Sequence, residues 1–151
     1  MSVTHWPGLN SRPGLLRRLA RGERLNAAVD WPHVIEEVQD VGLSELRACQ
    51  SLLQQALVHL LKLHAWPQNQ AAAHCRDEAG MFLDDAARRL TPSMRHRIGL
   101  DDIYGRALRR ARATSAVSGE PRPMPEACPF TVDGLLSGDV EALLAKLQAA
   151  S

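Results

Sequence analysis

The stretch from Leu43 to Trp66 constrains the fold more than any other part of this chain. At the helical angle of about 100° per residue, its apolar side chains gather on one half of the helix and its polar side chains on the other. The apolar half contains Leu61, Leu57, His64, Leu46, Leu53, Leu60, Cys49, Ala56, Leu63 and Leu52, and the polar half contains Arg47, Ser51, Gln54, Gln55 and Lys62. An apolar face this wide needs neighbours on at least two sides, so it predicts the central helix of a bundle, over about residues 44–66.

The composition narrows the class of protein. A chain of 151 residues with 45% hydrophobic and 23% charged residues suits one ordinary globular domain. Val and Ile are scarce, which argues against a sheet. The net charge of +1 gives no overall attraction to nucleic acid or membrane. With no apolar run near ~18 residues and three cysteines without paired spacing, we predict a soluble cytoplasmic protein with no membrane partner and no disulfide framework.

Helices are also predicted before the central one. Residues 1–12 should form a flexible arm, followed by a short helix over Pro13 to Arg21. Asp30 is expected to cap a second helix that ends near Gly42, and Ser44 to cap the central helix. So short a link would make these two helices near neighbours. The second helix places its apolar side chains in one narrow arc, formed by Trp31, Val34, Ile35, Val38 and Val41.

The C-terminal half continues the helical pattern with one interruption. Further helices are predicted from about Asn69 to Leu90, from Gly99 to about Val117, and from Asp139 onward, with short segments after Ser93 and Thr131. Alternating prolines give residues 118–130 an extended path across the bundle, as a strap. The prediction is a single all-α domain over residues 1–151, an irregular up-and-down helical bundle of five to six helices with a Pro-rich C-terminal strap.

Short motifs occur along the chain in a defined order. They are Leu15-Leu16-Arg17, Asp30-Trp31, Glu36-Glu37, His59-Leu60-Leu61-Lys62, Pro67, Pro92-Ser93, the spacing of Tyr104, Ala107 and Ala111, and Pro125 with Cys128-Pro129-Phe130. In this order and spacing the chain resembles a bacterial family called domain of unknown function 29, from roughly Gly14 to Asp139. The family's usual Ser-Trp pair is replaced by Ala73-His74. The resemblance implies an all-helical fold and no established activity.

Acid/base chemistry has one candidate group of residues. His59 lies at the edge of the central helix's apolar face, with Lys62 on its polar side. Glu37 borders the apolar arc of the preceding helix, so a contact between Glu37 and His59 is expected if the two helices face each other. Such a pair could serve as a catalytic carboxylate and imidazole, or only as an interhelical hydrogen bond that fixes register.

A metal site is the sharper alternative. His33 and Glu37 are four residues apart, so they share a helix face that His59 or His64 would have to complete. His59 and His64 project about 140° apart and cannot share one face. His64, in the middle of the leucines, is better read as a hydrogen-bonded core histidine. We therefore predict no cofactor and keep a transition metal bound by His33, Glu37 and His59 as an alternative.

Positive charge supplies the remaining candidate. From Arg88 to Arg112 there are eight arginines and only two acids. Such density can bind phosphates or an acidic partner, and it can equally be a solvated surface. The candidate binding residues are Arg88, Arg89, Arg106, Arg109 and Arg112.

The function predicted from these observations is that of a small soluble non-enzymatic interaction or accessory protein with an unidentified protein partner. A homo-oligomer is kept as an alternative form of partner. The two other functional alternatives are a metal-dependent or acid/base enzyme using Glu37, His59 and Lys62, and a nucleic-acid-binding module using the arginines. An enzyme should have a pocket where Glu37 and His59 converge, whereas an interaction protein should expose an apolar or basic patch.

Overall fold

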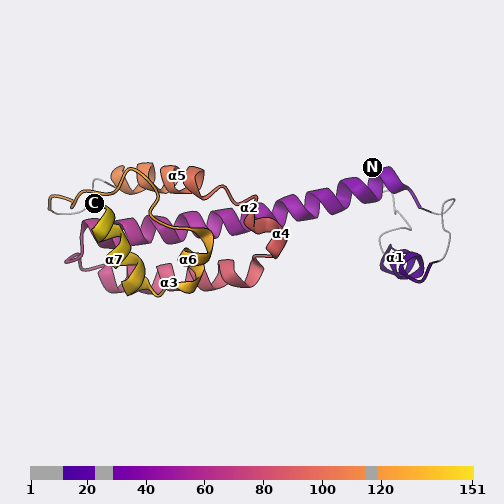
Figure 1. The fold of residues 1–151 in the computed structure, drawn as a ribbon, viewed down its shortest axis with the longest axis horizontal. Coiled ribbons are helices and arrows are strands. Elements are labelled where there is room, and N and C mark those ends of the chain that lie inside the picture. Colours follow the sequence, from indigo (N-terminus) through magenta and orange to yellow (C-terminus); the bar gives the residue numbers. More distant parts are fainter. Residues whose placement is uncertain (1–11, 23–28, 115–118) are drawn as a thin grey trace, which may run out of the picture. The chain divides into compact units, whose positions relative to one another are not determined.

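The computed structural model describes residues 12–22, 29–114 and 119–151. In these residues the regular secondary structure consists of seven helices without a strand, which confirms the all-α prediction (Figure 1). The helices are α1 (Arg12–Ala20), α2 (Trp31–Ala65), α3 (Ala72–Arg89), α4 (Pro92–Arg95), α5 (Leu100–Arg112), α6 (Val132–Ser137) and α7 (Val140–Ala150). The count exceeds the expected five to six because the short segments α4 and α6 are helical. Most of the predicted N-terminal arm lies outside the described residues.

The chain divides into two compact units, Met1–Val41 and Gly42–Ser151. The prediction of a single domain over residues 1–151 stays a prediction. None of the described helices has the length and apolar character needed to cross a membrane.

The central helix is longer than the sequence indicated. The expected break at Gly42 and N-cap at Ser44 are wrong, because α2 runs without interruption from Trp31 to Ala65. A glycine inside a helix costs only about 1 kcal/mol relative to alanine, which is less than a break needs when no proline or cap competes. The start of α2 was predicted well, since the backbone N–H of His33 lies 3.4 Å from the Asp30 carboxylate.

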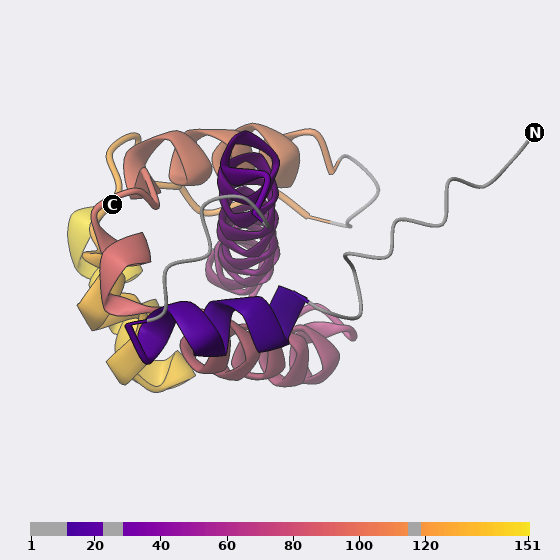
Figure 2. The ribbon, with the colours of Figure 1, turned by 90° about the vertical axis from the view of Figure 1, so that its right-hand side faces the viewer.

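In the unit Gly42–Ser151, the C-terminal part of α2 forms the core. Its predicted apolar half is buried from Leu46 to His64, except that Leu52 is half-buried. Viewed along α2, helices α5, α3 and the pair α6 and α7 lie on three of its sides (Figure 2). Helix α5 contributes Ile103 and Tyr104, each at most 1% exposed, and α7 contributes Leu143 and Leu147. Burial of these aliphatic side chains is the main source of stability for this unit.

The C-terminal helices begin where the sequence predicted them. The Thr131 hydroxyl accepts a hydrogen bond from the backbone N–H of Gly134 and starts α6, and the Asp139 carboxylate accepts one from Ala142 and starts α7. Helix α5 ends at Arg112, before the predicted end near Val117, and residues 115–118 lie outside the described part of the chain.

Residues 119–131 contain no helix and contact both α2 and α5. The Tyr104 hydroxyl donates a hydrogen bond of 2.6 Å to the carbonyl of Pro125, and the backbone N–H of Arg122 donates one to the carbonyl of Ala65. His64 is 6% exposed, with Nε2 2.8 Å from the Pro123 carbonyl oxygen. His64 is thus the buried, hydrogen-bonded core histidine that the sequence favoured.

In the unit Met1–Val41, the apolar arc of α2 is largely exposed. Ile35, Val38 and Val41 are 53%, 62% and 65% exposed. The predicted side-by-side packing of two helices joined at Gly42 does not exist, because both belong to α2. The side chains of this arc therefore lack the covering that the sequence pattern led us to expect.

Candidate functional site

The residues proposed for acid/base or metal chemistry fall in both units. His33 and Glu37 belong to Met1–Val41, and His59 and Lys62 belong to Gly42–Ser151. The expected contact between Glu37 and His59 assumed two facing helices, whereas both residues lie on α2. Among the described residues, no group of three or more His, Cys, Asp or Glu side chains is arranged to hold a metal ion. The catalytic and metal assignments of His33, Glu37, His59 and Lys62 stay predictions.

Three of the five candidate arginines form ion pairs. Arg88 Nη2 lies 2.9 Å from a carboxylate oxygen of Asp85, and Arg89 Nη1 lies 3.6 Å from one of Glu45. Arg112 pairs with Glu126 at 2.5 Å. Exposed pairs of this kind add little stability, yet each supplies a local carboxylate that offsets the charge of its arginine.

The Arg112–Glu126 pair also shifts the pKa values of both groups. The hydrogen bond from Arg112 lowers the pKa of the Glu126 carboxyl and, reciprocally, raises the pKa of the Arg112 guanidinium. Both groups are therefore charged in the pair at neutral pH. Arg112 is thus a poor choice for binding a negatively charged ligand, because its strongest hydrogen bond already goes to a carboxylate.

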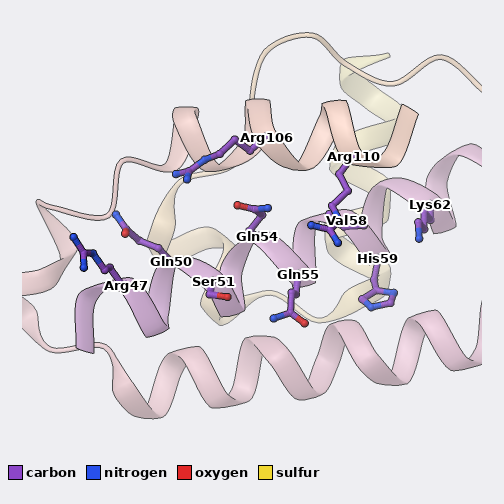
Figure 3. A pocket seen from close by; sticks show the side chains of 10 residues that line it. All are labelled: Arg47, Gln50, Ser51, Gln54, Gln55, Val58, His59, Lys62, Arg106 and Arg110. Carbon is purple, nitrogen blue, oxygen red and sulfur yellow. The ribbon is translucent and has the colours of Figure 1, made fainter. Parts of the chain in front are cut away.

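One of the two remaining candidate arginines lines a groove between α2 and α5. Arg106 lines this groove together with Arg110, which the sequence analysis had not singled out, whereas Arg109 on the same helix does not line it. The groove has a volume of about 830 Å³. Its lining consists of Arg47, Gln50, Ser51, Gln54, Gln55, Val58, His59, Lys62, Arg106 and Arg110 (Figure 3).

The helical repeat explains why these side chains share one surface. Along α2 they recur at intervals of three or four residues from Arg47 to Lys62, on the side opposite the buried leucines. Arg106 and Arg110 are one turn apart on α5 and both line the groove, and Figure 3 shows Arg110 extending toward this side of α2. The buried faces of α2 and α5 therefore fix the position of the groove, because they hold its two walls against the common core.

The groove is positively charged. Arg47, Lys62, Arg106 and Arg110 contribute four cationic groups, and no carboxylate is among the lining residues. Three glutamines and a serine add polar donors and acceptors between them. One of these is held in place, since the Gln50 side-chain amide donates a 3.0 Å hydrogen bond to the carbonyl of Ile98. A ligand in this groove would meet cations at both ends and amides in the middle.

His59 forms part of the wall near α3. Its ring stacks on Phe82, with centroids 5.7 Å apart and planes at 15°. Burial is the largest cause of a lowered pKa for His59, and the nearby positive charge of Lys62 lowers that pKa further. Nδ1 is buried without a hydrogen-bond partner in the described part of the chain. His59 thus contributes a largely neutral, packed imidazole to the groove.

The sequence contained part of the signal for this groove. Arg47, Ser51, Gln54, Gln55 and Lys62 were all placed on the polar half of the central helix. That half resembled any solvated helix surface, and only the position of α5 adds two arginines to it. Arg89 and Arg112 instead pair with Glu45 and Glu126, acids distant in sequence, and these pairs too depend on tertiary contacts.

Comparisons with known proteins agree with the all-helical fold. Residues 16–140 match the model of a family described as Domain of unknown function DUF29. A crystal structure of an alpha-helical protein of unknown function from Rhodospirillum rubrum is similar to this chain, with 30% sequence identity and a TM-score of 0.74. The similarity covers 91% of this chain and 90% of that one. No curated protein matches the sequence significantly.

Proposed function

We propose a binding function for this chain, which belongs to the DUF29 family of domains of unknown function. It is a non-enzymatic interaction protein that binds an acidic segment of a partner protein in the groove between α2 and α5. The observation that carries this proposal is the set of four cationic side chains, Arg47, Lys62, Arg106 and Arg110, in a groove of about 830 Å³ lined by no carboxylate.

Unbalanced charge of this kind favours an anionic ligand. Several exposed arginines elsewhere in the same unit are offset by nearby acids, as Arg88 is by Asp85 and Arg112 by Glu126. In the groove, mutual repulsion among like charges is relieved when a ligand supplies carboxylates. Arginine is well suited to this, because its planar guanidinium binds a carboxylate through two parallel hydrogen bonds.

Two features favour a polypeptide over a nucleic acid. The groove lining contains no Phe, Tyr or Trp on which a base could stack, and His59 already stacks on Phe82. The net charge of +1 gives little of the long-range attraction on which phosphate-backbone binding relies. Gln50, Gln54 and Gln55, in contrast, offer amides that can both donate to and accept from a peptide backbone.

The groove lining is less suited to acid/base catalysis than to binding an acidic peptide. General acid/base catalysis by an imidazole is usually assisted by a group that orients it, commonly a carboxylate. No carboxylate lines the groove with His59. The packing of His59 against Phe82 agrees better with a structural role for the ring.

Fluorescence anisotropy with a labelled Glu- and Asp-rich peptide tests the proposal. The peptide is titrated with the full-length wild type and with the variants Arg106→Glu, Arg110→Glu and Arg109→Glu. We expect each of the two groove variants to weaken binding at least tenfold, and Arg109→Glu to change it less than threefold, because Arg109 is on the same helix but does not line the groove. Binding should also weaken as salt is raised.

Several outcomes would contradict the proposal. Absence of peptide binding at low salt would remove it, and equal losses in all three variants would assign the effect to general charge. Labelled duplex DNA and RNA are titrated in parallel. Tighter binding of a nucleic acid than of the peptide, lost on Arg106→Glu, would assign the groove to phosphate recognition instead.

A further inference from the structure

We infer that the unit Met1–Val41 carries a docking face for a second copy of this chain. We call it the apolar face, and it is formed by Leu16, Trp31, Ile35, Val38 and Val41, which are 48%, 37%, 53%, 62% and 65% exposed. The inference is independent of the groove between α2 and α5, since none of these residues lines that groove. Single exposed apolar residues are ordinary on protein surfaces, but five gathered in one small unit are not.

The spacing along α2 is that of a helix-pairing surface. Trp31, Ile35 and Val38 follow one another at intervals of four and three residues. This is the spacing of the two core positions in a heptad, which places the three side chains in one row along the helix. Such a row is usually buried against another helix, and within the described residues of the unit Met1–Val41 it stays largely exposed.

The apolar face contains both projecting side chains and a hollow. Val38 and Val41 of α2 and Leu16 of α1 line a largely apolar depression of about 250 Å³ next to the projecting row, and Glu37 is the one charged residue in its lining. A two-fold interface uses the same patch on both copies, so that patch must supply a projection and a matching recess. Trp31 is suited to the projecting role, because tryptophan is enriched among residues that dominate interface energies.

Charge favours an uncharged partner surface such as the face itself. Among the acids of this part of α2, Glu36 projects about 100° from Ile35 and Asp40 about 160° from Val38. Glu37 projects about 100° from Val38 and lines the depression. Two copies joined through their rows therefore keep Glu36 and Asp40 apart and leave Glu37 at the side of the row. A strongly basic helix would find its charges opposite the apolar row instead of opposite the acids.

The exposed area of the apolar face is also adequate for a dimer interface. From their exposed fractions, the five side chains offer apolar surface on the order of 400 Å². A standard interface buries about 800 Å² on each partner, of which somewhat more than half is apolar. The apolar face thus supplies most of the apolar area that one side of a stable dimer needs. Backbone atoms and a polar rim would supply the rest of the buried area.

Sedimentation equilibrium of the full chain over a range of concentrations tests the inference. The wild type should form a dimer, and Ile35→Glu with Val38→Glu should raise its dissociation constant at least tenfold. Met81→Glu is the matched control, because Met81 is 60% exposed on α3, is not part of the apolar face, and should leave the dissociation constant within twofold of the wild type. Ile35→Gln, which adds no charge, should shift it in the same direction to a smaller extent. Circular dichroism verifies that each variant remains helical.

A wild type that stays monomeric throughout the range would overturn the inference. So would a dimer that all the variants form equally well, because its interface would then lie elsewhere. A one-to-one complex with an unrelated Leu- and Lys-rich helical peptide, formed while the protein itself remains monomeric, would assign the apolar face to a foreign helix and would equally overturn it. None of these outcomes bears on peptide binding in the groove.

Discussion

The two ends of α2 have similar amphipathic patterns but different surroundings. From Leu46 to Ala65 the apolar side is buried, and Leu53, Leu57 and Leu60 are fully inaccessible. From Trp31 to Val41 the apolar side is mostly exposed. The polar sides differ as well, since Glu36, Glu37 and Asp40 are acidic, whereas Arg47 and Lys62 line a cationic groove.

This difference shows that periodicity identifies a surface that requires a partner without identifying the partner. The C-terminal part of α2 meets helices from its own chain, and the free energy of burying its leucines stabilises the unit. The N-terminal part has no such cover among the described residues of its own unit. Substitutions at the two ends should therefore have very different consequences.

The largest effect is expected when a buried and an exposed side chain of α2 are truncated in two separate variants. Leu53→Ala removes a fully buried side chain and should lower the free energy of unfolding by about 2–5 kcal/mol, because it leaves a cavity in the core. Val38→Ala, at a position 62% exposed, should change it by less than about 0.5 kcal/mol at protein concentrations low enough to dissociate a dimer. Urea denaturation of both variants measures this. Equal losses would mean that the N-terminal part of α2 is as well packed as the C-terminal part.

The second largest effect is expected at the contact between Tyr104 of α5 and residues 119–131. Tyr104→Phe leaves the carbonyl of Pro125 without its 2.6 Å hydrogen bond and should cost about 1–3 kcal/mol of unfolding free energy. Burial raises the pKa of Tyr104 to about 12. In the unfolded chain the phenol ionises near 10, so wild-type stability should fall as pH rises from about 10 to about 12.

The Tyr104→Phe variant has no phenol to ionise and should lack this part of the alkaline loss. Chemical denaturation at pH values from 8 to about 11 compares the two proteins. Parallel pH profiles in the wild type and the variant would show that Tyr104 ionises as easily in the folded state as in the unfolded state. The phenol would then be accessible to water in solution, contrary to its burial in the structure.

The smallest effect concerns the junction between the two parts of α2. Gly42 lies inside the helix, and a Cβ atom there would meet nothing within 4 Å. Gly42→Ala should therefore raise the free energy of unfolding by roughly 0.5–1 kcal/mol. Gly99→Ala is the contrast, because Gly99 has a φ of 65°, which disfavours alanine and should lower stability. A loss of stability in Gly42→Ala would show that α2 is bent or broken at this residue in solution.

Much of the fold was predictable because helix boundaries are local. Asp30, Thr131 and Asp139 are caps whose side chains bond to backbone groups within three residues. Gly42 misled the prediction, since glycine both ends helices and is tolerated within them. The candidate site was less predictable, because Arg106 and Arg110 acquire their significance from the packing of α5 beside α2.

The sequence by itself determined that the chain is helical and which side of each helix is apolar, because both depend on side chains three or four residues apart. Only the tertiary structure decided which apolar sides are covered and which arginines face an acid. Apolar residues of α2 form a buried core at Leu53 and an exposed row at Val38. Arginines of α5 form a neutralised pair at Arg112 and part of a cationic groove at Arg110. The physical reason is that burial and charge pairing depend on neighbours distant in sequence, and local periodicity carries no information about them.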